Sequence, residues 1–132
     1  MHTGSCLCGA VKFEVRGEIG PAAYYCHCSR CRKSSGSAFA SNAVVAAKDF
    51  FVVQGEQSLK TFSTSAGVHR QFCSVCGSPI VSRRENMPEI VRIRLGTLDT
   101  PLPLAPSAHI FVASKADWFD IRDELPQHPE RP

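Results

Sequence analysis

Seven cysteines lie in three short groups within this sequence of 132 residues. The groups are Cys6 and Cys8, then Cys26, Cys28 and Cys31, then Cys73 and Cys76. An odd number of cysteines cannot all pair as disulfides within one molecule. In a reducing compartment, closely spaced cysteines favour metal binding or catalysis. The spacing therefore predicts metal sites, which divide the sulfurs into a set of four and a set of three.

The set of four is made of the two outer pairs. Cys73 and Cys76 enclose two residues and precede a glycine, which is typical of a zinc knuckle in which two thiolates hold one ion across a tight turn. Cys6 and Cys8, which also precede a glycine, supply a second pair. If hairpins bring the pairs together, they form a closed Cys₄ site, which is a structural type of site. The alternative is four unrelated buried cysteines, which are common singly but rarely doubled at ligand spacing.

The central group differs because it offers three sulfurs and no fourth cysteine nearby. Catalytic zinc keeps three protein ligands and leaves one position for water or substrate. Cys26, Cys28 and Cys31 could surround one ion if the chain turns after Cys28, and the serines and the glycine that follow favour a turn. We therefore expect two zinc ions per chain, one in a closed site and one in an open site.

Three histidines compete for the fourth position of the open site. His27 lies between two of its cysteines, but in an extended segment its side chain points away from the face of its neighbours. His69 and His109 could reach the site from strands, although histidines in such positions are more often satisfied core or surface residues.

Positive charge near the central group has two interpretations. Three thiolates on Zn²⁺ leave a net charge of −1, which Arg30, Arg32 and Lys33 could offset, or these residues could bind a substrate carboxylate. They could equally form a solvated basic face. The formal net charge of the whole chain is only +3, and its basic residues are mostly dispersed, which argues against a nucleic-acid partner.

Alternating side chains predict the elements that position these groups. Residues 11–16 and 91–95 alternate apolar and polar side chains, as half-buried strands do. Weaker strands are expected over residues 23–25, 39–46, 59–62, 68–72, 79–83 and 109–112. Helix is expected only as short turns at 48–51 and 115–119. The pattern predicts an all-β domain of antiparallel sheets.

Length and composition indicate one domain. A chain of this length with 43% apolar residues fits a single core, which we place at residues 1–120, followed by a proline-rich tail at 121–132. The end of this tail, from Pro126, is expected to be frayed. The N-terminus has no secretory signal, and no apolar run approaches the about 20 residues of a membrane-spanning helix. The sequence therefore predicts a soluble, cytoplasmic protein without a membrane partner.

Four segments together resemble a known family. GSCLCGAV, YCHCSRCRKSSGS, FCSVCGSPI and AHIFVASKADW are similar to the glutathione-dependent formaldehyde-activating enzyme family, whose domain is shared with centromere protein V. The resemblance runs from residue 4 to about residue 118, and every cysteine of its CxC, CxCxxC and CxxC pattern is present. It implies an Mss4-like fold of coiled antiparallel sheets with little helix. It also implies a structural zinc on Cys6, Cys8, Cys73 and Cys76, and a catalytic zinc on Cys26, Cys28 and Cys31.

The resemblance implies a reaction as well. Glutathione, or another thiol, would combine with formaldehyde or a related aldehyde, as in an S-(hydroxymethyl)glutathione synthase, which is a carbon–sulfur lyase in its reverse direction. Two other classes stay open, because fold alone does not fix function. One is a non-enzymatic zinc module of Mss4-like fold that contacts proteins or nucleic acids. The other is a redox or metal-buffering protein whose three central cysteines cycle between thiol and disulfide.

Overall fold

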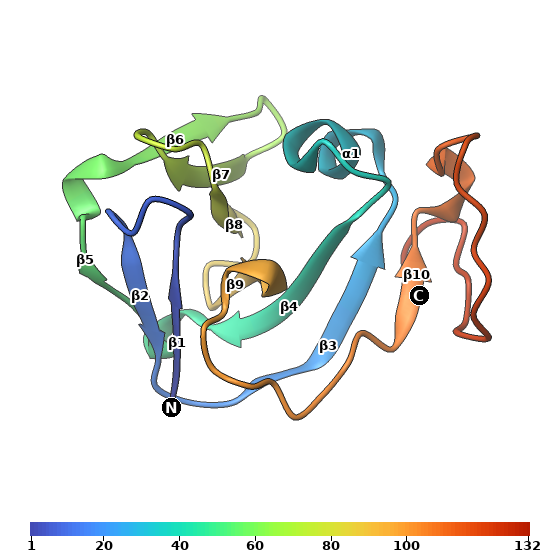
Figure 1. Ribbon diagram of the computed structural model, residues 1–132. Coiled ribbons are helices and arrows are strands. Elements are labelled where there is room, and N and C mark those ends of the chain that lie inside the picture. Colours follow the sequence, from blue (N-terminus) through green and yellow to red (C-terminus); the bar gives the residue numbers. More distant parts are fainter.

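Ten strands form two sheets in the computed structural model, which describes residues 1–132 (Figure 1). The smaller sheet has the order β1 (His2–Ser5), β2 (Lys12–Val15) and β5 (Phe50–Gln54). The larger sheet has the order β10 (Ala108–Ile110), β3 (Ile19–Cys26), β4 (Ala40–Ala46), β9 (Ile90–Arg94), β8 (Pro79–Arg84), β7 (Val68–Cys73) and β6 (Leu59–Ser63). All neighbouring strands are antiparallel except β10 and β3, which are parallel.

Helical structure is scarce. The only α-helix is α1 (Ser29–Ser35), and the four 3₁₀ turns are η1 (Ala47–Asp49), η2 (Glu56–Ser58), η3 (Leu95–Thr97) and η4 (Val112–Ser114). None of these helices has the length and apolar character required to span a membrane. The prediction of an all-β fold with little helix is confirmed.

Each expected strand is present, but β1, β5 and α1 are additional elements. β1 carries no alternating pattern, because Gly4 lies under the ring of Phe13 of β2 and has no room for a Cβ. The helical turn expected at 48–51 ends at Asp49, and Phe50 already begins β5. A turn is present in the segment expected at 115–119, where the N–H of Phe119 donates to the carbonyl of Ala116 at 3.3 Å. The 3₁₀ turn η4 precedes it and was not expected.

The two faces of the larger sheet differ in chemistry because side chains alternate along each strand. The main core holds Phe13, Val15 and Phe50 of the smaller sheet. From the central strands of the larger sheet it holds the odd-numbered Ala43, Val45, Val81, Val91 and Ile93 and the even-numbered Ile80. Six even-numbered residues of β4, β8 and β9 face the other way, and most of them are polar; they are Asn42, Val44, Ser82, Arg84, Arg92 and Arg94. The larger sheet therefore separates the core from a polar face.

The C-terminal tail is bound along β10, which differs from the frayed end expected from the sequence (Figure 1, red segment beside β10). The N–H of His109 donates to the carbonyl of Pro126 at 2.9 Å, and the N–H of His128 donates to the carbonyl of His109 at 2.9 Å. Further along, the N–H of Phe111 donates to the carbonyl of Glu130 at 2.9 Å. Proline lacks an N–H but keeps its carbonyl, so a proline-rich segment can still accept hydrogen bonds from a strand edge.

We predict that deletion of residues 121–132 destabilises the protein. The deletion would leave the outer edge of β10 without backbone partners, and several hydrogen bonds at about 1 kcal/mol each would lower the melting temperature by about 10 °C. Thermal unfolding followed by circular dichroism measures this change. An unchanged melting temperature would show that the tail contributes nothing to the fold.

Candidate metal centres

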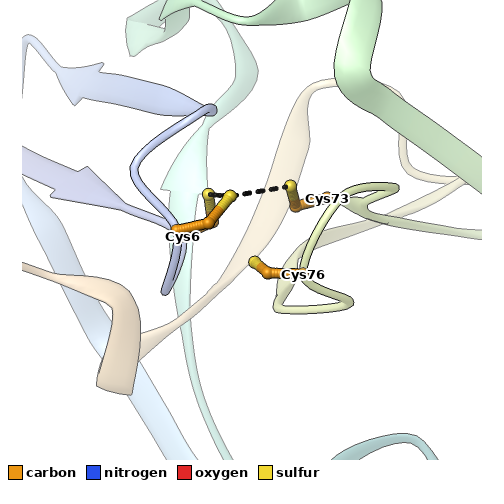
Figure 2. A group of neighbouring side chains, drawn as sticks. Cys6, Cys73 and Cys76 are labelled. Atoms are coloured by element: carbon orange, nitrogen blue, oxygen red, sulfur yellow. Dashed lines mark hydrogen bonds between the residues drawn. The ribbon is translucent and has the colours of Figure 1, made fainter.

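Four sulfurs converge between two turns that lie far apart in the sequence (Figure 2). Cys6 and Cys8 follow β1, whereas Cys73 ends β7 and Cys76 lies in the turn before β8. All four sulfurs lie within 4.8 Å of one another. The Sγ atoms of Cys6 and Cys8 are 3.6 Å apart, and those of Cys8 and Cys73 are 3.9 Å apart.

Both turns have the same local design. Gly9 and Gly77 adopt the left-handed conformation, with φ of 79° and 82°, which lets the chain reverse directly after each cysteine pair. The N–H of Gly77 donates to the carbonyl of Cys73 at 2.7 Å. Glycine at this position thus follows from the backbone geometry of the knuckle.

Ser78 ties the two turns together. Its hydroxyl accepts the N–H of Leu7 at 2.9 Å and lies 3.2 Å from the sulfur of Cys76. The hydroxyl proton is therefore free to point at that sulfur. This hydrogen bond, assisted by backbone N–H groups, lowers the pKa of Cys76 to about 5. A thiolate is the form of cysteine that binds a metal.

The three central sulfurs form a second group, within 4.8 Å of one another. Cys26 ends β3, Cys28 is the N-cap of α1, and Cys31 lies in the first turn of that helix. The backbone N–H of Cys31 donates to the sulfur of Cys28 at 3.3 Å. The thiols of Cys26 and Cys31 hold the pKa of Cys28 well below its usual value, and the backbone N–H adds to the effect. The chain does turn after Cys28, but the turn is a short helix, which the sequence did not predict.

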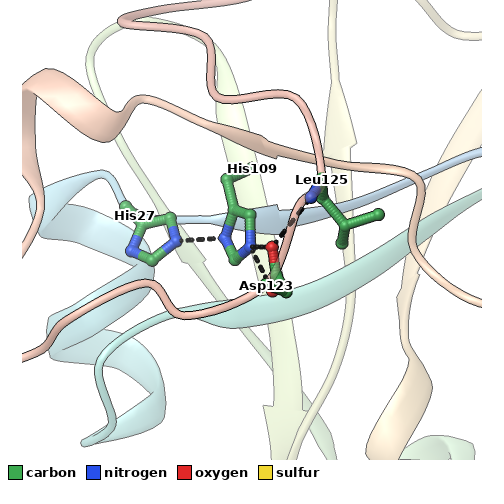
Figure 3. Close-up of polar contacts among 4 residues, drawn as sticks. All are labelled: His27, His109, Asp123 and Leu125. Atoms are coloured by element: carbon green, nitrogen blue, oxygen red, sulfur yellow. Dashed lines mark hydrogen bonds and ion pairs between the residues drawn. The ribbon is translucent and has the colours of Figure 1, made fainter.

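The candidate histidines are engaged elsewhere. Nε2 of His27 lies 2.8 Å from Nδ1 of His109, and Nε2 of His109 lies 2.9 Å from a carboxylate oxygen of Asp123 in the tail (Figure 3). His69 instead contacts Ser63 at 2.7 Å and Glu85 at 2.9 Å. None of the three histidines belongs to either sulfur group.

The His27–His109–Asp123 chain has a defined direction. Because the carboxylate of Asp123 accepts from Nε2 of His109, Nδ1 of a neutral His109 accepts in turn from His27. Burial lowers the pKa of His27 to about 4, so His27 is neutral near pH 7. These hydrogen bonds link the tail to the segment that carries the three central cysteines. Sequence spacing could not reveal this connection.

A pocket opens beside the three central cysteines. Its cavity has a volume of about 230 Å³. Its lining includes all three of these cysteines and the even-numbered face of the larger sheet. It also includes six arginines, namely Arg30, Arg70, Arg84, Arg92, Arg94 and Arg131. Of the basic residues singled out in the sequence near this group, Arg30 lines the pocket, whereas Arg32 and Lys33 do not.

Both sulfur groups fit zinc by their donors and spacing. Four sulfurs around a tetrahedral ion at about 2.3 Å lie about 3.8 Å from one another. The separations of 3.6 and 3.9 Å in the four-sulfur group match that edge length. The three-sulfur group supplies one donor fewer and borders the pocket, as an open site would.

Comparisons with known proteins identify a family, a curated relative and a solved structure that are similar to this chain. The sequence matches the family described as "Glutathione-dependent formaldehyde-activating enzyme" over residues 1–114. It is 34% identical over 128 residues to a curated Halomonas elongata protein named, provisionally, as such an enzyme; the match covers 89% of this chain and 79% of that protein. A crystal structure of a Rhodobacter sphaeroides protein matches with a TM-score of 0.65 and 30% identity, over 76% of this chain and 91% of that one.

We predict that the two sulfur groups respond differently to substitution. Cys76→Ser should weaken the four-sulfur site, and because metal binding at a closed site is coupled to folding, the protein should lose solubility or thermal stability. Cys28→Ser should lower the zinc content from about two ions to about one per chain while the sheets stay folded. Elemental analysis and circular dichroism measure both changes. Equal loss of structure in the two variants would contradict this division.

We also predict an order of metal loss. A chelator should remove the ion of the three-sulfur group first, because that ion has one protein ligand fewer and borders a pocket. Zinc release in the presence of a chromogenic chelator should therefore show two phases of equal amplitude. In Cys28→Ser the fast phase should be absent. A single phase containing both ions would argue against an open and a closed site.

Proposed function

Because the chain belongs to the glutathione-dependent formaldehyde-activating enzyme family, we propose that it joins glutathione, or a related thiol, to formaldehyde or a similar aldehyde at the three-sulfur group. The product is an S-hydroxymethyl adduct, which is a hemithioacetal, and the reverse reaction is that of a carbon–sulfur lyase. The observation that carries the proposal is the position of Cys26, Cys28 and Cys31 on the wall of a pocket. The four-sulfur group, by contrast, links two turns outside that pocket.

The proposal assigns a different task to each sulfur group. Cys6, Cys8, Cys73 and Cys76 would hold a structural zinc that fastens the smaller sheet to the β7–β8 hairpin. Cys26, Cys28 and Cys31 would hold a second zinc, which, when bound, favours the thiolate form of a thiol that enters the pocket. Because α1 and β3 fix the positions of the three cysteines, the thiol would arrive at a defined place.

The addition itself needs no oxidant. The sulfur of the thiolate attacks the carbonyl carbon, a carbon–sulfur bond forms, and the π electrons of the carbonyl move to its oxygen. That oxygen then takes a proton. In the net reaction, one thiol and one aldehyde give one hemithioacetal. Arg70, whose Nη2 lies 4.0 Å from the sulfur of Cys31, would donate to the developing oxyanion.

The proposal is tested by the rate of exchange rather than by product alone, because thiols add to formaldehyde unaided. In a mixture of glutathione, formaldehyde and S-hydroxymethylglutathione at equilibrium, NMR exchange spectroscopy measures how fast the adduct interconverts with its components. The zinc-loaded protein should accelerate this exchange, and Cys28→Ser should return the rate to the background without protein. We expect Cys28→Ala to behave in the same way.

Two outcomes would contradict the proposal. One is exchange at the background rate with fully zinc-loaded protein. The other is acceleration that persists in Cys28→Ser after its loss of one zinc ion has been verified. The first result would favour a zinc-dependent binding module, since such a module needs no chemistry at its metal.

A further inference from the structure

Six arginines and no carboxylate line the pocket beside the three central cysteines. Arg70, Arg84, Arg92 and Arg94 come from β7, β8 and β9, Arg30 from α1 and Arg131 from the bound tail. The strand arginines lie on one face of the larger sheet, where Arg94 is opposite Asn42, Arg92 is opposite Ser82, and Ser82 is opposite Arg70. The alternation of β9 thus places its arginines in a pocket, and Arg94 is only 7% exposed.

None of the six guanidinium groups is paired with an acid. The ion pairs of the protein involve Arg16, His69, His109 and Arg122 and lie outside the pocket. Arg70 donates to the hydroxyl of Ser34 at 3.4 Å, and Arg94 donates at 3.4 Å to the hydroxyl of Ser82 and to the carbonyl of Arg92. These partners carry no charge. Arg94 is buried and Arg70, Arg84 and Arg92 are half-buried. Partly desolvated cations without counterions are costly, so the pocket favours an anion.

The arginines also act on one another. Burial lowers the pKa of Arg84, and the charges of Arg131 and Arg70 lower it further. Burial likewise lowers the pKa of Arg92, followed by the charges of Arg131 and Arg84. Two of these residues come from neighbouring strands, whereas Arg131 is brought in by the tail. Holding these like charges at one place therefore lowers the stability of the fold, which is a property of binding sites.

The three cysteines cannot neutralise this cluster. Even as three thiolates around a divalent ion they would carry a net charge of −1, against six guanidinium groups. Arg70 is the arginine that hydrogen-bonds a sulfur of the group, through its Nη2 and Cys31 at 4.0 Å. Most of the positive charge is thus left for a ligand that extends from the sulfurs across β8 and β9.

One buried acceptor lies in the same pocket. Oδ1 of Asn42 has no hydrogen-bond partner, and Asn42 stands opposite Arg94 in the sheet. Because the pocket lining holds no acid, an N–H group of a ligand would be received by a neutral oxygen such as this one.

We propose that Arg84, Arg92 and Arg131 form an anion subsite that selects thiols carrying at least two carboxylate groups. The inference rests on the proposed function, because it assumes that the ligand sulfur lies at Cys26, Cys28 and Cys31. The carboxylates then lie over β8 and β9, where guanidinium groups bind them through paired N–H donors. Asn42 accepts an N–H group of the same ligand. Thiols without carboxylates lack these contacts and bind only through sulfur.

The test uses a ligand that cannot act as a thiol. S-methylglutathione keeps both carboxylates of glutathione but has no ionisable sulfur. In its diethyl ester both carboxylate charges are removed as well. Isothermal titration calorimetry of the zinc-loaded protein should show binding of S-methylglutathione that weakens as salt is added. Arg84→Gln and Arg92→Gln should each reduce its affinity about tenfold, and the exposed Arg131→Gln about threefold. The diethyl ester should bind weakly to all of these proteins, without a difference between them.

The controls separate binding from folding. Arg122→Gln removes an exposed arginine outside the pocket and should leave the affinity unchanged. Melting temperatures identify any variant that loses structure. Because Arg131 is exposed on the tail, Arg131→Gln should leave the sheet folded. Equal affinity of wild type, Arg92→Gln and Arg131→Gln for S-methylglutathione would overturn the subsite. So would equal affinity of wild type for the acid and for its diethyl ester.

The outcome is independent of the lyase chemistry. If the protein fails to accelerate adduct exchange but binds S-methylglutathione through these arginines, the subsite stands and the proposed reaction falls. If it accelerates exchange equally for glutathione and for cysteamine, a thiol without carboxylates, the reaction stands and the subsite falls.

Discussion

The alternation of side chains along β4 and β9, in the middle of the larger sheet, is the constraint on which the rest of the protein depends. One face of β4, β8 and β9 supplies the apolar residues of the main core, and the other face supplies arginines and asparagine. A shift of one residue in the pairing of β9 would exchange Ile93 with Arg94 and place a guanidinium in the core. The register that builds the core therefore also builds the pocket.

The two sulfur groups lie at different places in the fold, one between the two sheets and one at the pocket. The four-sulfur group joins two turns and connects the smaller sheet to the larger one, so that its metal would stabilise the packing of one sheet against the other. The three-sulfur group lies where β3 passes into α1, at the wall of the basic pocket. Thiolates are better tolerated beside guanidinium groups than alone, which connects the cysteine chemistry to the arginines.

The parts of the site that follow from local spacing could be predicted from the sequence. Both cysteine sets, the turns at Gly77 and after Cys28, and the alternation of residues 91–95 depend on neighbours in the chain, and the structure contains each of them. The pocket could not be predicted, because alternation shows only that Arg92 and Arg94 leave the core. Whether they meet water or a cavity depends on α1 and the tail, which reach this face from distant parts of the sequence. The contact of His109 with Asp123 was hidden for the same reason, since composition alone suggested a loose tail.

The most direct test of two unlike metal sites, one of them beside an anion pocket, is a crystal structure of the zinc-loaded protein with glutathione, measured with anomalous scattering at the zinc edge. We expect two anomalous peaks, one among Cys6, Cys8, Cys73 and Cys76 and one at Cys26, Cys28 and Cys31. The glutathione sulfur should lie beside the second peak, with its carboxylates at Arg84 and Arg92. A single peak, a disulfide within the three central cysteines, or glutathione bound away from the pocket would contradict this account.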